Sequence, residues 1–386
     1  MMDVFLVASK GIPARYGGFE TFVERLVRGK KSQEIQYHVS CMNNDEKHFQ
    51  YQGADCFNVR VPLPGPAGRI LHVSRVLSQV YRWKMKHPGQ DTIVYILGCR
   101  IGPLLKWHAA RLHKLRITIM VNPDGLEWKR AKWSGIEKRF LRYCEKCLVV
   151  NSDLAICDSV NIESYIKKTY AGKVKKTTFL AYGADVHPLA GTDETWNRWM
   201  KDKKIGSYGY YLIVGRFVPD NNYETMILEF MKAKTDKDLV IISNVEKNKF
   251  YDDLQRKTGF EQDHRIKFVG TVYEEELLRS IREHAFAYLH GHEVGGTNPS
   301  LLEALATTKV NLLLNIGFNQ EVAGKAARYW NKEEGSLSRL IENTEKLSNA
   351  KMEELGRLAK ERIRDAYSWP KICADYEEIF LRYERV

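Results

Sequence analysis

Apolar and polar residues follow two alternating patterns along this chain of 386 residues. Short apolar runs predict buried β-strands, and longer segments with an apolar residue every three or four positions predict amphipathic helices. In the first half, the expected strands cover 4–8, 37–41, 56–61, 92–97, 117–121, 154–157 and 177–180, and the expected helices cover 19–27, 69–86, 104–114, 135–148 and 159–169. This alternation is typical of a parallel sheet covered by helices.

A polar stretch containing Pro188, Gly191, Gly206 and Gly209 interrupts the alternation and predicts a linker. The alternation then restarts, with expected strands at 211–214, 239–243, 266–269, 286–289 and 310–314 and expected helices at 222–232, 247–257, 274–283, 300–306 and 334–343. The segment 351–383 predicts helices that are interrupted near Trp369-Pro370. We therefore expect two doubly wound α/β domains in tandem, which bind ligands at the carboxyl ends of their strands.

The net charge of +12 is concentrated in one segment of the chain. Residues 56–123 contain eleven Lys and Arg and a single acid, Asp91, so this segment alone carries +10. Such a charge predicts an anionic partner, which is a nucleic acid, a membrane surface or a phosphorylated substrate. No apolar stretch reaches the roughly 18–20 residues of a membrane span, and the first residues predict a strand rather than a secretory signal, so a cytosolic protein is expected.

Paired glycines follow the first expected strand, in the segment Gly11–Glu20 (GIPARYGGFE). Gly17 and Gly18 would let a phosphate or a sugar approach the backbone, where exposed N–H groups and the dipole of the following helix favour an anion. A tight turn between a strand and a helix, without any ligand, explains the same residues equally well.

An acidic residue, Asp124, follows the expected strand at 117–121 within the segment Asn122–Arg130. At the carboxyl end of a strand, its carboxylate would hold or deprotonate the hydroxyl group of an acceptor. The alternative is a Pro-Asp-Gly turn that the aspartate caps.

The second expected domain opens with the segment Tyr211–Asn222, in which a buried strand runs into Gly215 and Arg216. The guanidinium of Arg216 is always charged and suits a pyrophosphate. A surface ion pair is the alternative role for this side chain.

A further junction between a strand and a helix lies in the segment His290–Ala304 (HGHEVGGTNPSLLEA). Asn298 is a suitable N-cap and is followed by proline at the first helical position. The amides of Thr297, Asn298 and Ser300 would then face an anion. Glu303, one turn into the helix, would accept hydrogen bonds from a ribose diol.

Two short motifs resemble parts of metal sites. His290-x-His292-Glu293 lacks the further ligand of known signatures, and the lone Cys144-x-x-Cys147 has no second pair. Neither pattern is sufficient for a metal ion, so no metal is expected.

The expected helices of the basic segment place cations around an apolar face. The candidate residues for contact with an anionic membrane or with the acceptor are Arg69, Arg75, Arg82, Lys84, Lys86, Lys106, Trp107 and Arg111. Basic amphipathic helices that carry aromatic residues suit an anionic membrane surface. Two ordinary domain helices with solvated Lys and Arg side chains are the alternative.

Together, these motifs resemble those of the family 4 glycosyltransferases, which have the GT-B fold of two Rossmann-like domains facing a cleft. The chain is especially similar to bacterial rhamnosyltransferases of streptococcal cell-wall and capsular polysaccharide synthesis. The similarity covers essentially the whole chain and is carried by GIPARYGGFETFVERL (11–26), VNPDGLEWKRAKWS (121–134), YLIVGRFVPDNNYE (211–224), FVGTVYEEELL (268–278) and HGHEVGGTNPSLLEALA (290–306).

The resemblance implies a retaining, metal-independent transferase that needs no cofactor and moves L-rhamnose from dTDP-L-rhamnose to a sugar linked to polyprenyl pyrophosphate. Residues 1–185 would bind the acceptor, with the basic segment 56–123 on the membrane side. Residues 206–366 would bind the nucleotide sugar, and residues 367–386 would form a helix that packs back on the N-terminal domain. The protein would then attach peripherally to the cytoplasmic face of the plasma membrane.

Matched by position, Gly17 and Gly18 would lie against the phosphate or the sugar of the donor. Arg216 would bind the donor pyrophosphate, and Glu303 would hold the ribose. Asp124 stands where the family places its acceptor-side catalytic loop.

The sequence departs from the family pattern at two positions. The family usually has Lys five residues after the arginine of the Gly-Arg pair, and this chain has Asn221. The family also has two glutamates separated by seven residues, and the first of them falls on Gly295. Glu293, two residues earlier, is the candidate substitute.

Three alternatives remain open at this point. One is a transferase of the same fold that uses a UDP-sugar, and another is a protein that binds a sugar nucleotide without catalysis. The basic segment is also compatible with binding to nucleic acid, although no nucleic-acid-binding module is recognisable.

Overall fold

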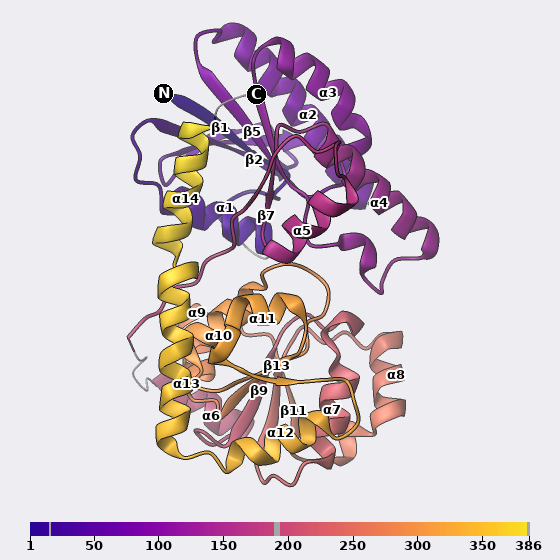
Figure 1. Cartoon of the computed structure of the whole chain (residues 1–386), viewed down its shortest axis with the longest axis vertical. Coiled ribbons are helices and arrows are strands. Elements are labelled where there is room, and N and C mark those ends of the chain that lie inside the picture. Colours follow the sequence, from indigo (N-terminus) through magenta and orange to yellow (C-terminus); the bar gives the residue numbers. More distant parts are fainter. Residues whose placement is uncertain (15–16, 189–193, 384–386) are drawn as a thin grey trace. The chain divides into compact units, whose positions relative to one another are not determined.

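The computed structural model describes residues 1–14, 17–188 and 194–383 (Figure 1). The chain divides into two compact units, of which unit 1 comprises residues 1–183 and 369–386 and unit 2 comprises residues 184–368. Arg15 and Tyr16 of the paired-glycine segment, residues 189–193 of the expected linker and residues 384–386 of the expected C-terminal helix lie outside the described residues.

Unit 1 contains an eight-stranded sheet with the order β3-β4-β2-β1-β5-β6-β7-β8. The strands are β1 (Met2–Val7), β2 (Ile35–Asn43), β3 (His48–Tyr51), β4 (Ala54–Arg60), β5 (Asp91–Leu97), β6 (Thr118–Asn122), β7 (Leu154–Cys157) and β8 (Thr177–Phe179). All pairings are parallel except that of β3 with β4. The chain builds one side of β1 first and then crosses to β5, so the direction of winding reverses between β1 and β5. Doubly wound folds bind ligands at such a point.

The helices of unit 1 come from both ends of the chain. They are α1 (Gly18–Arg28), α2 (Gly65–Lys86), α3 (Gly102–Lys114), α4 (Gly135–Val150), α5 (Val160–Thr169) and α14 (Trp369–Arg382). Helix α14, yellow in Figure 1, contacts α1 and β1. The hydroxyl groups of Tyr376 in α14 and Tyr95 in β5 lie 3.2 Å apart, and the Glu377 carboxylate accepts a hydrogen bond of 2.6 Å from the backbone N–H of Lys31. The expected return of the C-terminal helix to the first domain is confirmed.

The aromatic side chains of α14 predict that this helix stabilises unit 1. Phe380 is fully buried, and its ring lies 6.2 Å from Tyr37 and 6.0 Å from Tyr95. We expect Phe380→Ala to lower the free energy of unfolding by about 3–5 kcal/mol, because a large cavity would form. Urea denaturation would measure the change. Phe140→Ala, in which the replaced ring is 48% exposed, is the matched control, and equal effects of the two substitutions would contradict the expectation.

Unit 2 contains a six-stranded sheet, parallel throughout, with the order β11-β10-β9-β12-β13-β14. The strands are β9 (Tyr210–Val214), β10 (Asp238–Ile242), β11 (Ile266–Gly270), β12 (Ala287–His290), β13 (Asn311–Leu314) and β14 (Arg328–Trp330). The helices are α6 (Glu194–Lys203), α7 (Tyr223–Lys232), α8 (Lys249–Thr258), α9 (Glu275–Glu283), α10 (Pro299–Thr307), α11 (Gly317–Ala323), α12 (Ser336–Glu345) and α13 (Asn349–Arg362). The winding reverses between β9 and β12.

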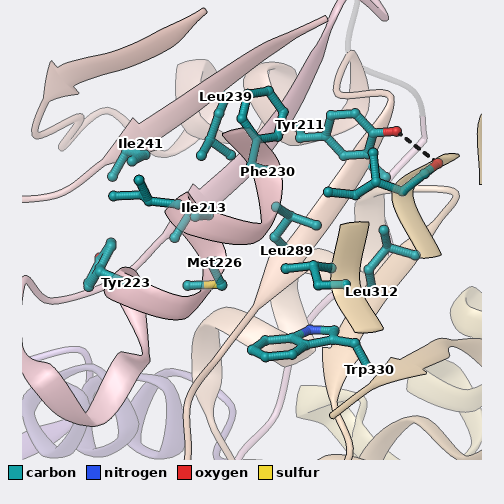
Figure 2. Packing of buried hydrophobic residues seen from close by; sticks show 14 of the residues in the cluster. Tyr211, Ile213, Tyr223, Met226, Phe230, Leu239, Ile241, Leu289, Leu312 and Trp330 are labelled. Carbon is teal, nitrogen blue, oxygen red and sulfur yellow. Dashed lines mark hydrogen bonds between the residues drawn. The ribbon is translucent and has the colours of Figure 1, made fainter. Parts of the chain in front are cut away.

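Aromatic and aliphatic side chains from this sheet and its helices form the core of unit 2 (Figure 2). Tyr211, Phe230 and Trp330 are buried within it. The hydroxyl group of Tyr211 donates a hydrogen bond of 3.5 Å to the carbonyl oxygen of Ile341, so the polar end of this buried ring is satisfied. This core fixes β9, whose carboxyl end leads to Arg216.

The expected linker is partly wrong, because it contains helix α6. Trp196 and Trp199 lie one helical turn apart on α6 and pack against Tyr210, Leu212 and Ile281. The polar and charged residues around the two tryptophans hid this apolar face in the sequence pattern. Near the other boundary, α13 ends at Arg362, a π-helical segment covers Ile363–Tyr367, and α14 begins at Trp369, so the expected interruption is confirmed and lies at Ser368.

Candidate functional site

The paired glycines follow β1 on the carboxyl edge of the unit 1 sheet, where Gly17 is the N-cap of α1 and Gly18 is the first residue of that helix. Gly17 has a φ angle of 132°, and a Cβ atom there would lie 1.9 Å from Oε2 of Glu20. Gly18 is exposed, and a Cβ atom there would meet nothing within 4 Å. Oε1 of Glu20 accepts a hydrogen bond of 2.8 Å from the backbone N–H of Lys10, which holds the loop. The fold therefore requires glycine at position 17, whereas at position 18 there is open space.

This difference predicts opposite results for two alanine substitutions. Gly17→Ala is expected to destabilise the protein by about 1 kcal/mol or more, because alanine disfavours a positive φ angle. Gly18→Ala is expected to leave the melting temperature unchanged but to lower kcat/KM, because a methyl group would occupy the open space where the sequence predicts a phosphate or a sugar. Thermal unfolding and steady-state kinetics would measure both effects. Full activity of Gly18→Ala would show that no ligand approaches this glycine.

Asp124 lies in the loop after β6, at the same edge of the sheet. Its backbone has a φ angle of 66°, and that of Leu126 is 50°, so two non-glycine residues of this loop are left-handed. The N–H of Asp124 donates to Oδ1 of Asn122 and the N–H of Gly125 donates to Oδ1 of Asp124, both at 2.8 Å. These two bonds hold the loop, and the half-buried carboxylate lies at the strand end where it was expected. Backbone strain of this kind is often found at functional sites.

A carboxylate that the sequence analysis did not single out, Glu127, follows in the same loop. Its Oε1 lies 3.4 Å from Nη2 of Arg100 and 3.0 Å from Nζ of Lys132, and its Oε2 pairs with Arg130. Burial would raise the pKa of Glu127, but the charges of Arg130, Lys132 and Arg100 outweigh burial and hold the pKa below its usual range. Glu127 is therefore an anion that organises the cations around it.

The basic segment does not form one uniform exposed face. Arg69, Arg75, Arg82, Lys86, Lys106 and Trp107 are exposed, whereas Arg111 is half-buried between the rings of Tyr81 and Trp107, at 4.4 and 4.6 Å. Lys84 is only 6% exposed, and its Nζ donates to the carbonyl oxygens of Pro88 and Gln90. The expectation that Lys84 reaches a membrane or an acceptor is therefore wrong, because two backbone carbonyl groups hold its charge inside the fold.

Arg216 lies immediately beyond β9, at the carboxyl edge of the unit 2 sheet. Its side chain is exposed, and its guanidinium has no ion-pair partner among the described residues. Nδ2 of Asn221 donates to the carbonyl oxygen of Arg216 at 2.7 Å, and Oδ1 of Asn221 lies 2.8 Å from Nδ1 of His292. Asn221 therefore braces the loop that presents Arg216 and also joins this loop to the one after β12.

The loop after β12 carries Glu293 next to a cation from another part of the chain. Oε2 of Glu293 lies 2.5 Å from Nζ of Lys332 and 3.0 Å from Nδ2 of Asn222. Burial would raise the pKa of Glu293, but the hydrogen bonds from Lys332 and Asn222 outweigh burial and hold its pKa below the usual range. Gly295 has a φ angle of 150°, and a Cβ atom there would lie 2.9 Å from Nε2 of His292. A glutamate at position 295 would not fit this loop, whereas Glu293 provides a carboxylate nearby in sequence.

Helix α10 begins where this loop ends. Asn298 is its N-cap, as expected, and Oδ1 of Asn298 accepts hydrogen bonds from the N–H groups of Ser300 at 2.9 Å and Leu301 at 3.3 Å. The amide of Ser300 is therefore occupied, which corrects the expectation that it faces an anion. Thr297 is buried, and the half-exposed carboxylate of Glu303 pairs with Arg282 at 2.6 Å.

The two histidines of this loop have different environments. Burial lowers the pKa of His290 to about 3, so its imidazole is neutral at physiological pH. His292 is held by Asn221. The part of the chain that the structure describes contains no group of three or more His, Cys, Asp or Glu side chains arranged for a metal ion. In the same part of the chain, no helix has the length and apolar composition to span a membrane.

Several of these residues gave no signal in the sequence. Arg100, Lys132 and Lys332 resemble ordinary surface cations, because nothing in their local sequence shows the carboxylate that each one meets. Asn222 has a left-handed backbone, with a φ angle of 55°, and is the first residue of the helix expected at 222–232, whereas α7 begins one residue later at Tyr223. Asparagine adopts this conformation more easily than most residues, so only Asn222 carried a detectable signal.

Comparisons with known proteins identify the fold. Residues 1–185 match a family described as a domain of unknown function (DUF1972). No curated protein sequence matches the chain. A sucrose-phosphate synthase from Thermosynechococcus elongatus is similar in structure, with a TM-score of 0.77 and 14% identity over 99% of each chain.

Two other solved structures show the same similarity. HepE from Anabaena, in complex with UDP and glucose, has a TM-score of 0.73 and 13% identity over 99% of this chain and 100% of that chain. A glycosyltransferase from Rickettsia africae has a TM-score of 0.74 and 11% identity over 99% of each chain. The chain therefore has the expected GT-B fold, with two Rossmann-like α/β domains.

Proposed function

We propose that this protein is a retaining glycosyltransferase that uses a nucleotide sugar as its donor. The observation that carries the proposal is the exposed Arg216 guanidinium, which has no ion-pair partner among the described residues and lies at the carboxyl edge of the unit 2 sheet in a GT-B fold. A diphosphate is a suitable ligand for such a guanidinium, because two of its N–H groups can bind two phosphate oxygens. The similarity to HepE, whose structure contains UDP and glucose, supports a nucleoside diphosphate as the leaving group.

The donor is proposed to be dTDP-L-rhamnose. Arg216 binds the diphosphate, Glu303 the ribose, and the loop at Thr297 and Asn298 lies next to the phosphates. Asn221 acts as a positioning residue, because its amide already bonds within the loop. A UDP-sugar is the second candidate donor, and it is favoured by the UDP in the HepE structure.

The acceptor is proposed to be a sugar linked to polyprenyl pyrophosphate. During transfer, an acceptor hydroxyl oxygen bonds to the anomeric carbon, and the bond from that carbon to the diphosphate oxygen breaks. The nucleoside diphosphate leaves with the bonding electrons, and Asp124 is the candidate to receive the hydroxyl proton. Glu293, ionised beside Lys332, is the candidate carboxylate near the donor sugar, in place of the family glutamate that falls on Gly295.

The protein is also proposed to attach peripherally to the cytoplasmic face of the plasma membrane. Exposed apolar side chains on neighbouring helices support this, namely Leu104 and Trp107 on α3 and Ile136, Phe140 and Tyr143 on α4. The three residues of α4 are spaced four and three positions apart and therefore share one helical face. Exposed Arg139, Arg142 and Lys146 on the same helix would favour anionic lipids.

A panel of donors and acceptors tests the proposal. The protein would be incubated with dTDP-L-rhamnose or UDP-sugars and with N-acetylglucosamine or glucose linked to polyprenyl pyrophosphate, and the product mass would be measured. A binding donor is also expected to raise the melting temperature. Transfer from a UDP-sugar alone would replace the donor assignment, and the absence of transfer from every donor would contradict the proposed function. Binding to DNA but not to anionic vesicles would favour the nucleic-acid alternative.

A further inference from the structure

Three cationic side chains converge on one carboxylate at the carboxyl edge of the unit 1 sheet. Arg100, Arg130 and Lys132 all contact Glu127, whose side chain is only 9% exposed. Arg130 is itself buried, with 10% of its side chain exposed. Because Arg130 pairs with Glu127, the single negative charge of Glu127 neutralises little of the positive charge of Arg100 and Lys132. This cluster therefore carries two positive charges more than its carboxylate can neutralise.

A fourth cation, Arg69, lies in the first turns of α2 and adds to this excess. Partial burial and the like charge of Arg100 lower the pKa of Arg69, so the two guanidinium groups repel each other electrostatically. The charges of Glu127 and Glu20 act in the opposite direction but are the smaller influences. Arg69 is exposed and forms no ion pair within the described ranges, so an anion from solvent can reach it.

Two of these cations are held in place rather than free to move in solvent. Arg100 and Lys132 lie over the ring of Trp133, at 5.5 and 4.6 Å, and the indole N–H of Trp133 donates to Oε1 of Glu127 at 3.2 Å. Nη1 of Arg100 is buried and has no hydrogen-bond partner among the residues described. A buried donor without a partner is unusual in folded proteins and indicates a missing ligand or water.

We infer that Arg69, Arg100 and Lys132 form a subsite for the diphosphate of the acceptor. Arg100 lies three positions after β5, and Lys132 lies in the segment after β6 that also carries Asp124. β5 and β6 are neighbours in the sheet. A diphosphate carries several negative charges, and each of its two phosphorus atoms has non-bridging oxygens that accept hydrogen bonds. Two guanidinium groups and one ammonium group can bind these oxygens. This inference rests on the proposed function and specifies its acceptor class, a sugar carried on a diphosphate ester.

Paired acceptors test the subsite in Arg69→Gln and Lys132→Gln, because both side chains are exposed and their loss is compatible with folding. One acceptor carries its sugar on a short prenyl diphosphate, and the other carries the same sugar on an uncharged alkyl group. We expect each substitution to raise KM for the diphosphate acceptor about tenfold more than KM for the alkyl acceptor. Lys129→Gln, which removes an exposed charge that lies over Trp128 rather than at Glu127, is the matched control.

Equal effects on the two acceptors, or no effect on either, would overturn the inference. A rise confined to the KM of the nucleotide sugar would also overturn it, because the cluster would then bind the donor diphosphate.

A binding measurement without any donor separates this inference from the proposed function. Inorganic pyrophosphate would be titrated by calorimetry into the full chain and into the double variant that combines Arg69→Gln and Lys132→Gln. The double variant is expected to bind pyrophosphate at least tenfold more weakly. If no donor supports transfer but this loss is observed, the proposed function fails and the anion subsite stands. If transfer occurs but the double variant binds pyrophosphate and uses both acceptors like the unchanged protein, the subsite fails and the proposed function stands.

Discussion

Replacing Arg216 by alanine is expected to lower kcat/KM for the nucleotide sugar by about 10–10²-fold. The guanidinium is exposed at the carboxyl end of β9, and no ion pair within the described part of the chain competes for it. A charged hydrogen bond contributes about 1.5–3 kcal/mol, and each 1.4 kcal/mol corresponds to about a factor of ten. Steady-state kinetics with varied donor, together with the rise in melting temperature on donor addition, would measure the loss.

Two further variants make this result specific. Arg216→Lys keeps the charge but not the planar fork, so we expect it to restore only part of the activity. Arg198→Ala removes an exposed arginine on α6 and is the matched control, with kinetics expected to equal those of the unchanged protein. If Arg216→Ala retains donor binding, the arginine does not bind the diphosphate.

Replacing Asp124 by asparagine is expected to lower kcat by about 10²–10⁴-fold, the range that a general base contributes. The change is conservative for the fold. Asparagine tolerates the left-handed backbone at this position, and its side-chain oxygen can still accept the hydrogen bond from Gly125. The expected outcome is therefore a protein with unchanged stability and donor binding but with little turnover.

A matched control for Asp124→Asn is available at the other edge of the same sheet. Asp91→Asn makes the same chemical change at the amino end of the neighbouring strand β5, on the opposite edge of the sheet from Asp124. The side chain of Asp91 is exposed, and its substitution should have no effect on kcat. Donor protection against thermal unfolding would be measured for both variants. Near-normal kcat in Asp124→Asn would reduce the role of this aspartate to that of a turn residue.

Much of the fold was predictable because the signals are local. Apolar runs such as those of β1 and β9 are buried on both faces of a parallel sheet, and this leaves a continuous apolar pattern. The N-cap at Asn298 was likewise predicted from a short-range rule. Helix α6 was missed because its two tryptophans are separated by Asn197 and Arg198 and flanked by polar and charged residues, so the segment as a whole has the polarity of a linker.

The candidate site was predictable only in part, for a related reason. Asp124 and Arg216 lie two positions after β6 and β9, and a strand places its next residues at a known edge of the sheet. Gly17 was predicted from its place before an expected helix, and it is the N-cap of α1. The partners of Glu293 and Glu127 come from other elements, and Lys332 lies 39 positions away from Glu293 along the chain. No spacing rule connects such residues, because the sheet brings them together only after folding.

The sequence by itself determined the two mainly parallel α/β sheets, the glycines at the start of α1, and the aspartate and arginine at strand ends, since these features depend on short-range patterns. Only the tertiary structure decided which charged side chains are buried and which of them pair with one another. It buries Lys84 against two backbone carbonyl groups, pairs Glu293 with Lys332, and gathers Arg100, Arg130 and Lys132 around Glu127. It also places α14 in unit 1, although unit 2 separates this helix from the rest of unit 1 along the chain. The physical reason is that charge pairing and core packing depend on distances in space, which the sheet order sets and the local sequence does not encode.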